Sequence, residues 1–145
     1  MMPTLHLLKL CVGAENVEDL ADWQAGRSAE ARVRGHDPRP VHVTRMWPRR
    51  GDDLLDGGSL YWVIKGLVLV RQRVVGLEPR TGADGIRRCG LRLDPELVRT
   101  APQPRRPFQG WRYLRPEDAP QDLPPGLGGD LSPELMAELA EVGVL

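Results

Sequence analysis

GGSLYWVIKGLVLVRQRVVGL, residues 57–77, is the longest β-rich run in the chain, and it decides the fold class. Its β-branched and aromatic residues predict two strands, one that begins at Ser59 and a longer one that begins at Leu67. The adjacent Lys65 and Gly66 interrupt the run, and a glycine at such a place indicates a tight turn or a bulge. The stretch therefore predicts consecutive antiparallel strands.

Alternation along the first of these strands separates its side chains into two faces. Tyr61, Val63 and Lys65 share one face, and Trp62 and Ile64 share the other. We therefore expect one aromatic ring of the adjacent pair in the core, and the other on the face that Lys65 occupies.

The flanking sequence adds helices and further strands. Residues 5–12 and 41–47 are predicted strands, and residues 15–35 between them predict a helix with Asn16 as N-cap and Gly35 as its stop. Residues 79–85 predict a loop, residues 86–94 a strand, and the seven prolines between 102 and 125 an extended arm with a short strand at 110–114. A second helix is predicted to begin at Ser132.

This order predicts an α+β fold, either a curved antiparallel sheet or a small β-barrel, with an N-terminal helix and a C-terminal helix. We expect one globular domain over residues 1–123 and an acidic extension with a short helix over residues 124–145.

The sequence predicts no membrane-spanning segment and no export signal at its start. The first residues, MMPTLHLLKLCVG, carry no base before their apolar run, and no apolar stretch is long enough to span a membrane. Cys11 and Cys89 lack the spacing of a zinc ribbon or a disulfide framework. We expect a cytoplasmic protein without a membrane partner; the sequence predicts no oligomeric state.

The charges balance overall but are segregated along the chain. Residues 42–115 hold 15 Lys and Arg against 7 Asp and Glu, whereas residues 116–145 hold 7 acids and no base. Of the 20 bases 18 are arginine, a residue that suits phosphates and that GC-rich codon usage also favours. The pattern is typical of a polyanion-binding surface with an acidic tail, or of two parts of one fold that neutralise each other.

Arginines interleaved with aromatic residues supply the groups that nucleic-acid binding needs, namely cations for phosphates and flat faces on which bases stack. The alternative is that the tryptophans are core residues and the arginines a solvated face. The predicted nucleic-acid-binding residues are Arg45, Trp47, Arg49, Arg50, Lys65, Arg71, Arg73, Arg105, Arg106, Trp111 and Arg112.

Catalysis is a weaker hypothesis, with Lys65, Thr44 and His42 as its candidate groups. His6 and His42 would form a general base or half a metal site if their strands placed them face to face. No GxSxG or SxxK motif accompanies them, and no acid or cysteine completes a ligand set. We therefore predict no metal and no cofactor.

The strings HVTRMWPRR, LLDGGSLYWVIKG, RQR, GIRRC and LDPELVRTAPQPRRPFQGWRYL, spread over residues 42–114, resemble a family of bacterial single-domain proteins known mainly from alphaproteobacteria. The resemblance runs from about Leu5 to about Leu123. That family is classed as a domain of unknown function, so it implies a host lineage and a cytoplasmic setting without an activity.

A more distant likeness concerns the layout of the strands. A strand that ends in basic residues, a glycine turn, the LYWVI strand, the KG turn and the long LVLVRQRVVGL strand look like PUA-like barrels, which include ASCH and EVE domains. This likeness implies binding of RNA or modified nucleobases, or an amidohydrolase activity on modified nucleosides. The ASCH signature GxKxxExR is absent, because Lys65 is followed by glycine.

These observations predict a binding module for RNA or a modified nucleotide. The alternatives are a small amidohydrolase-like enzyme that acts on a modified nucleoside, and a protein-interaction adaptor. We also expect the acidic tail to lie near the basic surface around Arg105 and Arg112 and to screen part of it.

Overall fold

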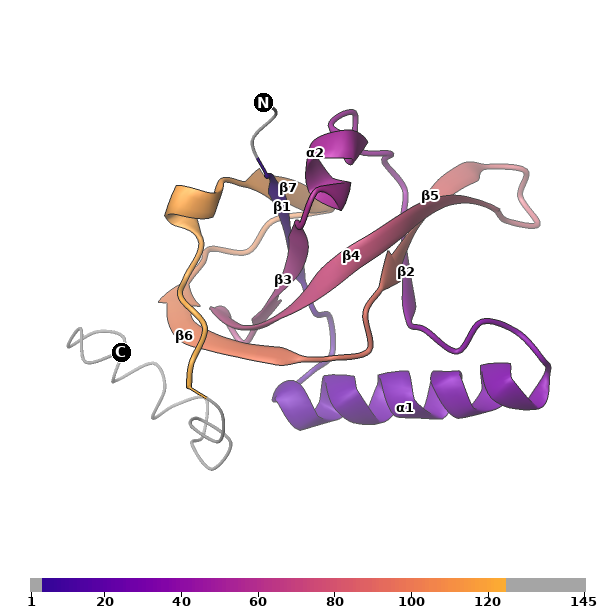
Figure 1. Cartoon of the computed structure of the whole chain (residues 1–145), viewed down its shortest axis with the longest axis horizontal. Coiled ribbons are helices and arrows are strands. Elements are labelled where there is room, and N and C mark those ends of the chain that lie inside the picture. The colour runs from indigo at the N-terminus through magenta and orange to yellow at the C-terminus, as the bar shows by residue number, and fades with distance from the viewer. Residues whose placement is uncertain (1–3, 125–145) are drawn as a thin grey trace.

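A mixed sheet of seven strands forms the frame of the structure, a computed structural model that describes residues 4–124 (Figure 1). The elements, in chain order, are β1 (His6–Leu10), α1 (Val17–Val33), β2 (Val41–Thr44), α2 (Gly51–Leu55), β3 (Ser59–Ile64), β4 (Leu67–Thr81), β5 (Arg87–Leu93), β6 (Val98–Pro104), β7 (Trp111–Leu114) and the 3₁₀ turn η1 (Pro116–Asp118). The predicted α+β class is confirmed. The helix predicted from Ser132 lies outside the described residues.

The strands follow the order β2-β5-β4-β3-β1-β7, and β6 pairs with β4 beside this path. β1 lies parallel to β3 and antiparallel to β7, and all the other pairings are antiparallel. The sheet is therefore mixed and, within residues 4–124, not closed, which corrects both the expected antiparallel sheet and its alternative, a small β-barrel. A parallel pair needs a long crossover connection, and the segment between β1 and β3 supplies one through α1, β2 and α2.

The long strand β4 bends the sheet. Its first half lies between β3 and β6, and its second half pairs with β5 in a hairpin that projects from the body (Figure 1). The register shifts once against each of these three partners, and such irregularities increase local twist and bend a strand.

β3 is the central strand, and all six of its residues are buried. Trp62 and Ile64 belong to the larger core cluster, while Tyr61 and Val63 belong to a second cluster on the other face. The predicted separation of the two rings onto opposite faces is confirmed, and both rings are buried because β3 is covered on both faces. Lys65 lies in the β3–β4 turn at φ 53°, followed by Gly66 at φ 81°, which confirms the predicted tight turn.

α1 begins and ends close to where the sequence predicts. The Asn16 side chain accepts the backbone N–H of Asp19 at 2.9 Å, and Gly35 follows the helix at φ 72°. Only Val17 and Leu20, at the start of the helix, are buried. The helix is therefore anchored to the core by its first turn.

Four elements differ from what the sequence predicts. α2 and β6 were not predicted: α2 is too short for a periodic pattern, and β6 carries two prolines. β2 ends at Thr44 rather than at residue 47, and β4 continues to Thr81 through residues predicted as a loop. Pro79 lies in this part of β4, which pairs with β5 along one edge and, within residues 4–124, has no strand along the other. A proline is tolerated in such an edge position because it has no N–H to donate.

Candidate functional site

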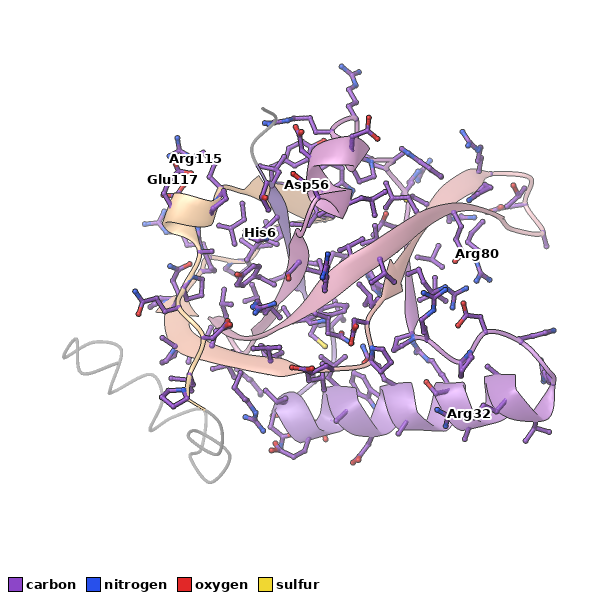
Figure 2. The ribbon with its side chains drawn as sticks, in the orientation of Figure 1. His6, Arg32, Asp56, Arg80, Arg115 and Glu117 are labelled. Atoms are coloured by element: carbon purple, nitrogen blue, oxygen red, sulfur yellow. The ribbon has the colours of Figure 1, made fainter. Side chains whose placement is uncertain are left out.

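A cavity of about 710 Å³ lies between α1 and the sheet. Its walls come from the end of β1, from α1 between Leu20 and Ala31, from the segment 36–40, the start of β2, Trp62 on β3, and the paired strands β4 and β5. Figure 2 labels Arg32 on α1 and Arg80 on the projecting hairpin, the two elements on either side of this region. Small-molecule sites in proteins have volumes of about 300–1,000 Å³, so one ligand of nucleotide size fits.

The helical wall is polar where a packed helix would be apolar. Gln24, Arg27, Ser28 and Ala31 all line the cavity, and their spacing places them on one face of α1. None of these side chains is a large apolar group that would fill the space between helix and sheet. The second half of α1 therefore leaves the space open.

A network of side-chain hydrogen bonds around Gln24 and Gln72 connects α1 to the sheet beside the cavity. Gln24 and Gln72 exchange two side-chain hydrogen bonds of 2.8 Å, and the indole N–H of Trp62 donates to Gln72 Oε1 at 2.9 Å. Gln72 Nε2 also donates to the carbonyl of Asp94 at 3.0 Å, although Gln72 is 0% exposed. Since every polar group of Gln72 is used, the network holds Trp62 rigidly in the cavity wall.

His42 contributes a neutral ring to the same wall. Its imidazole lies edge-to-face against Trp62, with ring centroids 4.9 Å apart, and its buried Nε2 has no hydrogen-bond partner among residues 4–124. Burial lowers the pKa of His42 to about 4, and the nearby positive charges of Lys9 and Arg27 lower it further. The ring therefore carries no charge at pH 7.

The cavity has more bases than acids. Five bases and two acids line it: Lys9, Arg27, Arg39, Arg80, Arg92, Asp37 and Glu78. Asp37 pairs with Arg39 at 2.7 Å, and Glu78 pairs with Arg92 at 2.8 Å and with Arg80 at 3.2 Å.

Lys9 and Arg27 remain without an ion pair within residues 4–124. Both lie near enough to His42 to lower its pKa. An anionic ligand in the cavity would therefore meet two cations that form no ion pair with a described acid.

Side chains of β7 contact the segment 45–50, and both belong to the surface predicted to bind nucleic acid. The indole N–H of Trp111 donates to the Met46 carbonyl at 3.0 Å, and the Arg50 backbone N–H donates to the hydroxyl of Tyr113 at 3.1 Å. The guanidinium of Arg87 lies 4.7 Å above the centroid of the Trp47 ring. The structure thus brings the segment 45–50 together with β7, although β2 and β7 are at opposite ends of the strand order.

Several predicted phosphate-binding bases are already engaged. Arg71 pairs with Asp122 and Arg50 with Asp53, while Lys65 pairs with Glu15 at 2.6 Å. Arg105 donates to Gln103, and Arg112 lies over the Phe108 ring. The exposed members of the predicted set that form no ion pair within the described residues are Arg45, Arg49, Arg73, Arg106 and Arg112.

The acidic segment reaches basic residues where it is described. Asp122 pairs with Arg71 at 2.7 Å, and Asp118 pairs with Arg115 at 3.0 Å. Residues beyond 124 are outside the description, so screening of the surface near Arg105 stays a prediction.

The three candidate catalytic groups are not brought to one place. His42 lines the cavity, but Thr44 and Lys65 do not. The Thr44 hydroxyl donates to the Met46 carbonyl at 3.1 Å, and Lys65 lies in the β3–β4 turn. Cys11 also lines the cavity, yet burial raises the pKa of its thiol to about 11, which leaves it protonated at neutral pH.

Sequence reasoning missed the cationic pair Lys9 and Arg27 and the amide pair Gln24 and Gln72. One pattern could have identified this wall: the predicted helix face carries Gln24 and Ala31 where a core-facing helix needs large apolar residues. The contribution of Lys9 depends on the curvature of the sheet, for which the local sequence gives no pattern.

Two further features of the described residues concern metal sites and membrane-spanning helices. Within residues 4–124, no group of three or more His, Cys, Asp or Glu side chains is arranged to hold a metal ion. In the same range, no helix has the length and apolar character needed to cross a membrane.

Comparison with known proteins gives a family and no activity. No curated protein matches the chain. No solved structure matches it either. Residues 7–145 match the model of one family, whose description is "Protein of unknown function (DUF1489)", and the chain therefore belongs to that family.

Proposed function

We propose that this protein is a binding module for RNA or a modified nucleotide, and that the cavity beside α1 takes one nucleotide. The cavity is the observation that carries the proposal, because it combines a nucleotide-sized volume, an aromatic wall and two cations without an ion pair. A cytoplasmic location, an alphaproteobacterial origin and the PUA-like relationship inferred from the strand layout belong to the same proposal.

The aromatic and amide groups suit a base. Trp62 and His42 form one wall, and Trp23 on α1 lines the cavity while 41% exposed. Unpaired bases bind proteins by stacking on aromatic rings and by hydrogen bonds along their edges. The hydroxyl of Ser28 is a polar group in the wall that could bond a base edge.

The cations suit a phosphate next to that base. Lys9 and Arg27 act on the same histidine, so both lie near the position a base beside His42 would occupy. β2 leads from His42 to its end at Thr44, and Arg45 follows directly, about 10 Å from His42 at the rise of a strand. A strand of RNA with one base in the cavity would have exposed arginines within reach.

Replacing Arg27 tests the proposal, with Arg32 on the same helix as the matched control. Arg32 is exposed and does not line the cavity. We expect Arg27→Gln to weaken binding of a short single-stranded RNA roughly tenfold at low salt, because one charge-assisted phosphate contact is lost. Its plot of log affinity against log salt should be shallower by about one.

Arg32→Gln should leave both quantities close to wild type. Fluorescence anisotropy with labelled RNA measures affinity at several salt concentrations, and calorimetry with 5′-mononucleotides tests the cavity alone. Equal effects of the two variants would indicate diffuse attraction. Absence of any RNA or nucleotide binding by the wild type at low salt would refute the proposal.

A further inference from the structure

A second cavity, of about 380 Å³, lies elsewhere on the molecule and shares no lining residue with the cavity beside α1. Its floor comes from β1, β3 and the first half of β4, and its other wall is the segment 116–122. That segment is held by its backbone, since Ala101 N–H donates to the Gln121 carbonyl at 2.8 Å and Thr100 forms an isolated bridge with Asp122. Figure 2 labels His6, on β1, in this part of the structure.

The tautomer of His6 is set by a backbone group. The N–H of Ser59 donates to Nδ1 of His6 at 2.9 Å, so Nδ1 carries no proton and the neutral ring holds its proton on Nε2. Burial lowers the pKa of His6, and the charge of Arg71 lowers it further. His6 therefore presents an N–H donor, and this Nε2 forms no hydrogen bond within residues 4–124.

Arg71 and Ser59 add further donors. Nε and Nη2 of Arg71 donate to the two oxygens of Asp122 at 2.8 and 2.7 Å, and Nη1 donates to Oγ of Ser59 at 3.1 Å. Because Ser59 Oγ accepts that bond, its own proton is free to donate. The guanidinium keeps two of its five N–H groups uncommitted, while both oxygens of Asp122 are already used.

Tyr61 completes the set. Its ring lies edge-to-face on His6 with centroids 5.0 Å apart, and the residue is only 4% exposed. Its hydroxyl has no hydrogen-bond partner within residues 4–124, yet it is not among the fully enclosed unsatisfied atoms, so it reaches the open space of the cavity. The sheet side of the cavity thus offers donors from four residues, His6, Ser59, Tyr61 and Arg71.

We propose that this second cavity is a binding site for a small molecule with a carboxylate group. A carboxylate is an acceptor with two oxygens, and it matches a wall whose free side-chain groups are donors. The charges of Arg71 and Asp122 cancel, so a single negative charge meets little repulsion. A doubly charged phosphate would have to give up more hydration without an uncompensated cation among the lining residues, so it is disfavoured. The site does not depend on nucleotide binding beside α1.

Acetate is the probe, and the histidine rings are the reporters. In two-dimensional NMR spectra of the ring nitrogens, acetate should shift the His6 signals in a saturable manner and leave the His42 signals unchanged. Chloride at equal ionic strength is the control for salt. Inorganic phosphate is the second arm, and we expect it to bind at least several-fold more weakly than acetate.

Tyr61→Phe removes one donor and keeps the ring that packs in the core. We expect acetate binding to weaken about fivefold to tenfold, as for the loss of one hydrogen bond. Tyr113→Phe, on β7 and outside the cavity, is the matched control and should bind acetate like the wild type.

Equal shifts with acetate and chloride, or an acetate affinity that Tyr61→Phe does not change, would overturn the proposal. Stronger binding of phosphate than of acetate would overturn the carboxylate assignment. If Tyr61→Phe failed to fold, the relative affinities of the wild type for acetate, phosphate and chloride would still test whether the cavity binds a carboxylate.

Discussion

The imidazole of His42 lies against Trp62, and its buried Nε2 accepts no hydrogen bond from the part of the chain that the structure describes. Its pKa of about 4 lies below the ordinary value of 6.5. Between these pH values the histidine is therefore protonated in the unfolded chain and neutral in the folded chain. The contribution of His42 to the unfolding free energy is therefore greatest above pH 6.5 and falls as the pH is lowered toward 4.

We therefore predict that His42→Gln flattens the pH dependence of stability between pH 6.5 and 4. The wild type should lose on the order of 2 kcal/mol from this ring across that window, and the variant should not show this loss. Urea unfolding at several pH values measures it. His6, whose pKa is also lowered, is retained in both proteins, so a slope that remains in the variant belongs to other groups, and an unchanged slope would contradict the prediction.

At the scale of elements, α1 shows what a sequence can and cannot reveal. The cap at Asn16 and the stop at Gly35 are local features, and both were predicted correctly. The cavity under α1 is not a local feature, because it depends on how far the sheet curves away from the helix. In the sequence, the cavity is indicated only by the small or polar side chains of Gln24, Ser28 and Ala31 on one face of α1.

Strand pairing shows the same division. The Lys65-Gly66 turn and the buried positions of β3 follow from composition, whereas the direction of β1 does not, because a short apolar run pairs equally well in either direction. β6 was missed because prolines usually disfavour strands, yet this strand has β4 on one side and only the bridge to Asp122 on the other.

Gly26 provides a test of how α1 is held. It lies in the middle of the helix, and a Cβ at this position would meet no atom within 4 Å. We predict that Gly26→Ala stabilises the protein by about 0.5–1 kcal/mol, because alanine loses less backbone entropy in a helix. Thermal and urea unfolding measure the change.

Gly58→Ala is the contrasting variant, because its Cβ would collide with the carbonyl oxygens of Leu5 and Leu54. Backbone atoms cannot move aside cheaply, so we expect a loss of about 3 kcal/mol. A destabilised Gly26→Ala would mean that the helix needs a bend or a closer approach that the structure does not show.

At the scale of the whole molecule, the open sheet has its two outermost strands tied together by side chains. Trp111 reaches the Met46 carbonyl and Tyr113 reaches the Arg50 N–H, so the loop after β2 crosses to β7. This closure was only partly predictable. The sequence grouped residues 45–50 with residues 111–113 by composition, and their contact depends on the curvature of all seven strands.

Removing the indole donor tests this tie. We predict that Trp111→Phe lowers the unfolding free energy by about 1 kcal/mol more than Trp23→Phe, because Trp111 loses a hydrogen bond of 3.0 Å while Trp23 is 41% exposed and has no hydrogen bond within the described residues. Denaturant unfolding of both variants measures the difference. Equal losses would show that the bond adds nothing beyond ring packing.

The position of β1 has a consequence for how the chain is made. β1 lies between β3 and β7, so its partners are residues 59–64 and 111–114, which leave the ribosome long after it. At about 5–20 residues per second, the first strand waits several seconds with both edges unpaired. We expect the β3–β4–β5 hairpins to form first and the N-terminal strand to insert last, which makes the nascent chain a client for chaperones that shield exposed strand edges.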